Sequence, residues 1–218
     1  MKLDSTGILI SLRPFSERDL IAHIFTYEYG IMCGMMRGAA IARKNKPLVG
    51  QVGAATWNAR LDSQLGTFHW DAEKNLAAPL MMDAVRLSFM NAALDLLDAL
   101  LPERAQYETL YNETIELLTQ MATNNPRDAY LAWEINLLRE LGYELDTSHC
   151  ASCGGTNNLN YLSPRTGRAV CDACAAPYIS KLYKLPLNLN VTLRFIDSVC
   201  TGQGCTLPLS RRIIKNTI

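Results

Sequence analysis

The apolar residues of the first 70 positions fall in short runs, which predicts strands. These runs lie at 8–12, 20–26, 31–36, 52–61 and 67–70. Each run is bounded by turn residues such as Arg13-Pro14 and Tyr29-Gly30, so the connections are expected to be short. Five short strands in this length of chain favour a small OB-like barrel, because a barrel closes its own sheet edges.

The spacing of apolar residues changes near residue 80 to one typical of helices. From Asp83 to Leu101 the polar positions recur every three or four residues and leave a broad apolar stripe. A second helix is expected over about 105–122. A third is expected to begin at Asn125-Pro126, where Asn caps free amides and Pro has none to leave unpaired, and to stop at Gly142.

The two patterns together predict an α+β chain with more than one domain. We expect a five-stranded barrel domain over residues 1–77 and a helical domain over residues 78–218. The helical bundle is acidic, because residues 78–145 hold 4 basic and 11 acidic side chains although the whole chain has a formal charge of +0. This middle region is therefore not expected to face a polyanion.

The barrel segment contains one concentrated group of basic residues. Arg37, Arg43, Lys44 and Lys46 lie within ten residues that include no acidic side chain. Such a run predicts either a contact with phosphates or a solvated basic loop without a ligand.

Four of the seven cysteines form two CxxC motifs. Cys150 and Cys153 are separated from Cys171 and Cys174 by 17 residues, a spacing typical of a zinc ribbon. The intervening YLSPRTGRAV segment reads as a strand, a turn and a second strand. We therefore expect one structural Zn²⁺ in a finger at about 147–177, inserted in the helical domain, with no coordination position open to water.

Two disulfides, or a redox-active CxxC, would use the same cysteines. The first residues, MKLDSTG, do not resemble a secretory signal, and no thioredoxin-like βαβ pattern surrounds either motif. Cys33, Cys200 and Cys205 are expected to take no part. No apolar run reaches the roughly 18 residues that cross a bilayer, so a cytoplasmic protein without a membrane partner is expected.

The sequence contains none of the common catalytic motifs. It has no phosphate-binding loop, no GxGxxG, no GxSxG and no HExxH, and its only histidines are His23, His69 and His149. We therefore expect no catalytic residues and no enzyme; a metal-dependent hydrolase would need an open metal site.

A barrel with a basic loop is a common platform for nucleic acid, because aromatic side chains stack on bases while cations neutralise phosphates. The aromatic residues available for this are Tyr27, Tyr29, Trp57, Phe68 and Trp70. At least half of them are expected to fill the barrel core instead.

Short motifs recur in a distinctive order along almost the whole chain. They include GILISLRP at 7–14, TYEYG at 26–30, MRGAA at 36–40, LLPE at 100–103 and YLSPRTG at 161–167. Together with the order of barrel, acidic bundle and four-cysteine finger, they resemble the bacterial DNA repair and recombination mediator family RecO.

The resemblance implies a mediator that binds single- and double-stranded DNA and anneals complementary strands. It also implies engagement of the single-stranded DNA-binding protein SSB and, with RecR, assistance in loading RecA, in the cytoplasm at the nucleoid. Phosphate contacts are then expected at Arg13 and at the loop residues Arg37, Arg43, Lys44 and Lys46.

Two features limit what the resemblance implies about the metal and about DNA contacts. Some members of the family lack the four cysteines, so the metal is not implied to be essential. The chain also ends with a basic tail, Arg211–Lys215, that either touches DNA or caps the final helix. The competing hypothesis is an adaptor whose zinc ribbon and acidic bundle bind a protein partner, without direct affinity for DNA.

Overall fold

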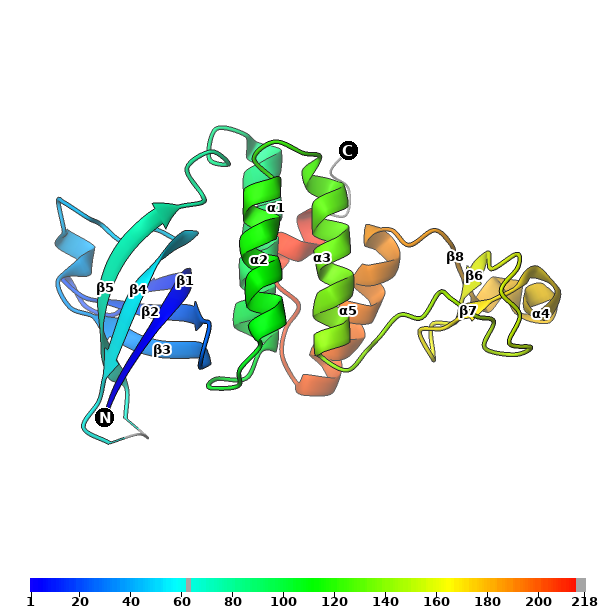
Figure 1. The fold of residues 1–218 in the computed structure, drawn as a ribbon, viewed down its shortest axis with the longest axis horizontal. Coiled ribbons are helices and arrows are strands. Elements are labelled where there is room, and N and C mark those ends of the chain that lie inside the picture. The colour runs from blue at the N-terminus through cyan, green and yellow to red at the C-terminus, as the bar shows by residue number, and fades with distance from the viewer. Residues whose placement is uncertain (62–63, 215–218) are drawn as a thin grey trace. The chain divides into compact units, whose positions relative to one another are not determined.

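A computed structural model describes residues 1–61 and 64–214. The N-terminal residues form a closed barrel with the strand order β1-β2-β3-β5-β4, and β4 pairs back onto β1 (Figure 1). The strands are β1 (Lys2–Pro14), β2 (Leu20–Thr26), β3 (Gly30–Met36), β4 (Gln51–Asn58) and β5 (Gly66–Asn75). The β3–β5 pair is parallel and the other pairs are antiparallel. The predicted five-stranded, OB-like barrel is confirmed, with β1 and β5 longer than their apolar runs.

The barrel is filled by side chains that alternate along its strands. In β4, Gly53, Ala55 and Trp57 point inward, as the period of two requires. The Trp57 indole Nε1 donates a hydrogen bond to the carbonyl of Cys33 at 3.0 Å. A Cβ at Gly66 would lie 2.1 Å from the Trp57 ring, so only glycine fits beside this side chain. Trp57 therefore closes the core instead of facing a ligand.

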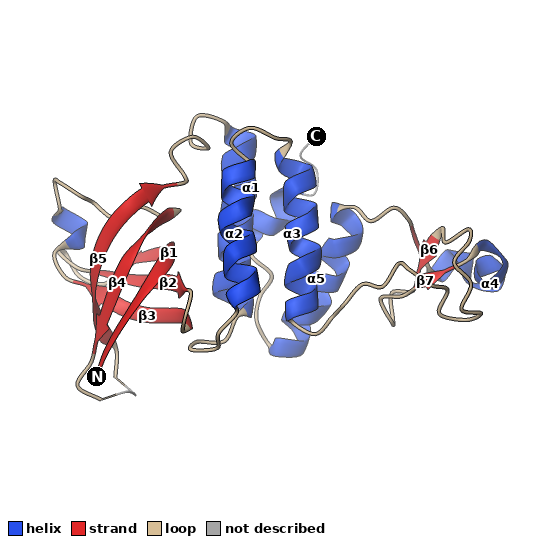
Figure 2. Cartoon of the chain, viewed as in Figure 1, coloured by secondary structure: helices blue, strands red, loops and turns tan. Residues whose placement is uncertain are grey.

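Three longer helices follow the barrel, close to the predicted positions (Figure 2). They are α1 (Ala84–Leu100), α2 (Glu108–Gln120) and α3 (Pro126–Glu140). The Asp83 carboxylate caps α1 by accepting from the amides of Val85 and Arg86. Asn125 accepts from the amide of Arg127 at 3.0 Å where α3 begins, and Gly142 takes a φ of 84° just beyond its end.

The chain forms two compact units, and the boundary falls within α3. The first contains Met1–Tyr130 and the segment from Cys205, including the short helix α6 (Leu209–Ile214); the second contains Leu131–Gly204. In the first unit α6 packs against α1. The division expected at residue 77 stays a prediction about domains that fold on their own.

The second unit holds the cysteine module and helix α5 (Leu189–Gln203). The module has a three-stranded sheet in the order β7-β6-β8 and two short helical segments, α4 and η2. Their bounds are β6 (Tyr161–Leu162), β7 (Ala169–Val170), α4 (Asp172–Ala175), η2 (Ala176–Lys181) and β8 (Tyr183–Lys184). Tyr161 pairs with Val170 across the turn, which confirms the predicted strand, turn and strand. No helix in the described ranges is both long and apolar enough to cross a bilayer.

Candidate metal centre and nucleic-acid interface

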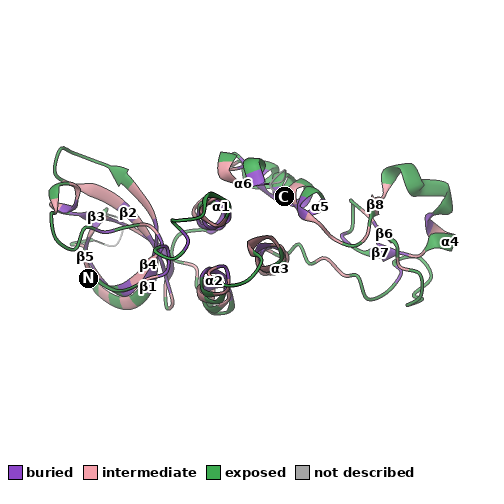
Figure 3. Cartoon of the chain, turned by 90° about the horizontal axis from the view of Figure 1, so that it is seen from above, coloured by how far each residue is buried: buried purple, intermediate pink, exposed green. Residues whose placement is uncertain are grey.

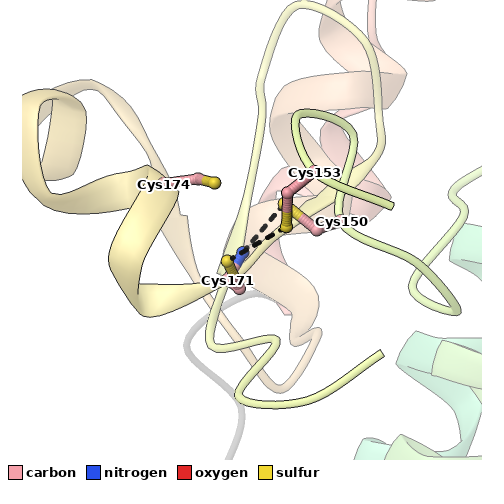
Figure 4. Close-up of side chains that lie close together, drawn as sticks. All are labelled: Cys150, Cys153, Cys171 and Cys174. Carbon is pink, nitrogen blue, oxygen red and sulfur yellow. Dashed lines mark hydrogen bonds between the residues drawn. The ribbon is translucent and has the colours of Figure 1, made fainter. Parts of the chain in front are cut away.

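The structure brings the four cysteines of the CxxC motifs together. Their Sγ atoms all lie within 4.8 Å of one another, and the Sγ atoms of Cys153 and Cys171 are 3.7 Å apart (Figure 4). A tetrahedral zinc ion with bonds of about 2.3 Å places its sulfurs about 3.8 Å apart. All four cysteines are free thiols, so the structure does not support the disulfide alternative. This set of donors fits a single metal ion.

The backbone around the first motif folds toward the sulfurs. The amide of Gly154 donates to the carbonyl of Cys150 at 2.9 Å, and Gly154 takes a φ of 73° that favours glycine. The amide of Cys171 donates to the Sγ of Cys150 at 3.4 Å. Backbone hydrogen bonds from Cys153, Cys171 and Ser152 lower the pKa of the Cys150 thiol to about 6. These contacts favour the thiolate form, which is the form that binds metals.

The thiol of Cys174 shows the opposite tendency. A hydrogen bond with Ser152 lowers its pKa, but contacts with the thiols of Cys171 and Cys153 outweigh it and raise the pKa to about 11. Four sulfurs this close repel one another when charged, and a bound cation removes that repulsion. His149 is exposed, lies outside the sulfur cluster and is in hydrogen-bond contact with Ser148 through Nδ1.

The predicted basic loop connects β3 to β4, and its basic side chains are exposed to solvent on the surface of the barrel. Arg37, Arg43, Lys44 and Lys46 are all exposed, and none of them pairs with an acidic side chain in the part of the chain that the structure describes. Four unpaired cations on one connection produce a positive surface suited to phosphates.

The turn between β1 and β2 packs against this loop and adds a cation that the sequence did not reveal. The amide of Ala40 donates to the carbonyl of Arg18 at 3.0 Å, and the amide of Gly38 donates to the Asp19 carboxylate at 2.8 Å. The Gly38 contact contributes most to lowering the pKa of Asp19, with smaller contributions from Ser16, Arg37 and Arg18. In the sequence Arg18 lies between Glu17 and Asp19, which hides its charge.

Arg13 lies on β1 and is engaged elsewhere. Its guanidinium donates to the Asp98 carboxylate of α1 at 2.7 Å, and the other oxygen of Asp98 contacts Nδ1 of His23. The hydrogen bond with Asp98, followed by the contact with Cys33, raises the pKa of His23 to about 10 despite partial burial. Arg13 as a phosphate contact therefore stays a prediction, and a phosphate would compete with Asp98 for it.

The five candidate stacking aromatics take different positions. Trp57 and Phe68 are buried in the barrel core, and Tyr29 packs against that core. The Tyr27 hydroxyl donates to Glu108, and its ring meets Tyr111 edge-on at 5.5 Å.

Trp70 is the candidate that lies beside the basic loop. It lines a hollow of about 190 Å³ together with Arg37, Asn45 and His69. Its indole Nε1 is buried and has no hydrogen-bond partner among the described residues. In the adjoining β1–β2 turn, Phe15 is a further exposed aromatic that the sequence pattern did not single out.

The residues of the basic tail differ in how far they are buried. Arg211 is buried in α6 with its guanidinium 5.7 Å from the ring centre of Tyr130, so it belongs to the interior of the first unit. Arg212 is exposed, and Lys215 lies outside the described residues.

Comparison with known proteins covers most of the chain. The family model described as "Recombination protein O N terminal" matches residues 1–70, and "Recombination protein O C terminal" matches residues 81–202. A protein named DNA repair protein RecO from Jannaschia sp. (strain CCS1) is 39% identical over 203 residues, which is 92% of this chain and 82% of the relative. Proteins of the same name from Ruegeria sp. (strain TM1040) and Rhodospirillum centenum are also 39% identical, over 83% and 85% of this chain and 76% of each relative. The chain therefore belongs to the recombination protein O family, RecO, as the order of its motifs predicted.

Proposed function

We propose that this protein is a DNA repair and recombination mediator that binds single- and double-stranded DNA through its barrel. In this proposal it anneals complementary strands and, with RecR, assists loading of RecA on DNA coated with SSB. The main observation that supports DNA binding is the group of exposed, unpaired cations on the β3–β4 loop, which lies beside Trp70 on a closed barrel. Membership in the RecO family supports the same function.

Annealing in this proposal needs no chemical step. Two DNA strands repel each other because their phosphates are charged, and cations that neutralise phosphates release counterions and lower that repulsion. Arg37, Arg43, Lys44 and Lys46 supply the charge, and Arg18 adds to it. A nucleotide that enters the hollow would meet the aromatic side chain of Trp70.

The other two regions take supporting roles in the proposal. The cysteine module holds one structural Zn²⁺ through Cys150, Cys153, Cys171 and Cys174, which keeps its fold and offers no open position for catalysis. Exposed acidic residues of α2, including Glu108 and Glu116, disfavour DNA and are assigned to protein partners such as RecR or SSB.

The test is the salt dependence of binding to a fluorescein-labelled single-stranded oligonucleotide, followed by anisotropy. The triple variant Arg43→Ala, Lys44→Ala, Lys46→Ala should bind more weakly, and its slope of log affinity against log salt should be shallower by about 2, because each single-strand contact contributes about 0.7. Lys2→Ala is the matched control, since Lys2 is an exposed barrel lysine already paired with Asp4 at 3.0 Å. Failure of the folded, zinc-loaded wild type to bind at low salt would overturn the proposal in favour of a protein-binding adaptor.

A further inference from the structure

A hollow of the second unit lies on the cysteine module and is lined in part by Ala151, Ser152 and Cys174 of the two CxxC motifs. Its volume is about 640 Å³, and two further segments line it besides the CxxC motifs. One is the β6–β7 turn with Ser163, Arg165 and Thr166, and the other is η2 with Tyr178 and Lys181. A hollow of this size accommodates a ligand as large as a nucleotide.

The η2 wall presents an aromatic ring and a cation together. Tyr178 and Lys181 are three residues apart in a 3₁₀ helix, and side chains with this spacing lie one above the other. Tyr178 is 58% exposed, so its ring is accessible to a ligand. Both residues line the hollow, so the ring and the ammonium group share one binding surface.

Arg165 supplies a second cation from the β6–β7 turn. Neither Arg165 nor Lys181 is paired with an acidic side chain in the described ranges. Residues 147–184 hold four basic residues and one acidic residue, Asp172. Both carboxylate oxygens of Asp172 accept from the side-chain amide of Asn160 at 3.0 Å, and Asp172 does not line the hollow. No carboxylate lines this hollow, although Glu144, which pairs with Arg139 at 3.7 Å, lines a neighbouring hollow together with Arg165.

We propose that this hollow is a second contact for single-stranded nucleic acid, in which a base stacks on Tyr178 and Arg165 and Lys181 hold the flanking phosphates. Stacking on an aromatic ring between cations is the usual way that proteins bind single strands without reading their sequence. The hydroxyl groups of Ser163 and Thr166 add hydrogen-bonding partners for phosphate or base edges. An acidic peptide would satisfy the cations but would leave the exposed ring unused. The inference rests on the proposed DNA binding and extends it from the barrel to the cysteine module.

The experiment compares two labelled oligothymidylates, one of about 10 nucleotides that occupies the barrel alone and one of about 40 nucleotides that reaches further. Tyr178→Ala in the full, zinc-loaded protein should weaken binding of the long strand about tenfold and leave the short strand within about twofold. Tyr178→Phe should restore the affinity, because stacking needs the ring and not the hydroxyl. Arg165→Ala with Lys181→Ala should make the salt slope for the long strand shallower by about 1.4.

Ile179→Ala is the matched control, because Ile179 is half exposed in the same η2 segment but does not line the hollow. Zinc content, measured for every variant, shows that the module is intact. A second readout is photo-cross-linking with 5-iododeoxyuridine in the long strand, which should map to Tyr178. Normal binding of the long strand by Tyr178→Ala, with no cross-link in residues 161–184, would overturn the inference and leave the barrel proposal standing. Failure of the wild type to bind either strand would overturn both.

Discussion

The barrel and the cysteine module are stabilised in different ways. The barrel interior is a continuous apolar cluster in which Leu9, Ile24, Met32 and Trp57 are almost completely buried. The module has a small apolar cluster of Cys150, Val170 and Ala175, and Leu162 and Ala169 are also buried in it. Most of its chain is exposed or half-buried (Figure 3). The barrel is therefore stabilised by many apolar contacts, whereas the module has few, and we expect a metal ion held by the four sulfurs to supply most of its stability.

This difference decides how each region responds to damage. Removing one apolar side chain from a large core costs a few kcal/mol and leaves the other contacts in place. Removing one thiolate from a four-sulfur centre weakens the binding of the ion itself, and in small zinc domains metal binding supplies roughly 10 to 16 kcal/mol of folding free energy. Loss of the metal should thus unfold the module and leave the barrel folded.

The largest expected effect is the loss of one metal ligand. Cys171→Ser should abolish retention of zinc and unfold residues 147–184 locally, because their small core does not offset the loss of about 10 kcal/mol of metal-binding free energy. Hydrogen exchange should show lost amide protection in β6 and β7 and unchanged protection in β2 and β3. Cys205→Ser is the control, since Cys205 is a free thiol outside the sulfur cluster and its replacement should leave the zinc content at one ion per chain. Persistent protection of β7 without metal would contradict this account of the module.

An effect of intermediate size is expected inside the barrel. Trp57→Ala should lower the free energy of unfolding of the barrel by about 3 to 5 kcal/mol, because it removes a buried indole and its hydrogen bond to the Cys33 carbonyl. Denaturant unfolding followed by circular dichroism measures this change, while zinc content should not alter. Trp70→Ala, at a half-buried position on the next strand, should cost clearly less. A loss for Trp57→Ala no larger than that for Trp70→Ala would contradict the assignment of Trp57 to the centre of the barrel core.

The smallest effect concerns pH and the His23–Asp98 contact. His23 has a pKa of about 10 in the folded protein and about 6.5 when unfolded, so its charged form stabilises the fold fully below pH 6.5, and this stabilisation disappears as the pH rises through 10. His23→Gln should lose about 2 kcal/mol at pH 6 and should flatten the pH dependence of unfolding between 6.5 and 10. His69→Gln, at an exposed position, is the control and should retain the wild-type profile. A variant profile as steep as that of the wild type would assign the pH dependence to other groups.

Local signals made several features predictable from sequence. The metal donor set follows from two CxxC motifs, because each pair needs only a short turn to point both sulfurs the same way. The helix starts at Asp83 and Asn125 and the stop at Gly142 depend on capping and backbone conformation within a few residues. Strand runs were also recognisable, although their ends were not, because pairing in the barrel extends β1 and β5 into polar sequence.

The nucleic-acid surface was only partly predictable. The sequence identified the cations between residues 37 and 46, but Arg18 joins them only because the β1–β2 turn packs against the loop. Arg13 resembles the other cations in sequence, yet the structure pairs it with Asp98, 85 residues away. Composition cannot reveal such a pairing, because it depends on which elements meet in space.

The sequence by itself determined the kind of protein this is: an OB-like barrel, acidic helices and a four-cysteine module in the order that marks the RecO family. Tertiary structure alone decided which aromatic side chains are available to a ligand. Trp57 and Trp70 lie on adjacent strands and look alike in the sequence, but barrel closure buries one and places the other beside a hollow next to the basic loop. Tyr178 joins Lys181 and Arg165 for the same reason, since the fold of the module brings separate segments to the lining of one hollow. Short-range motifs encode chemistry locally, whereas burial and the meeting of charges are set by contacts between residues far apart in the chain.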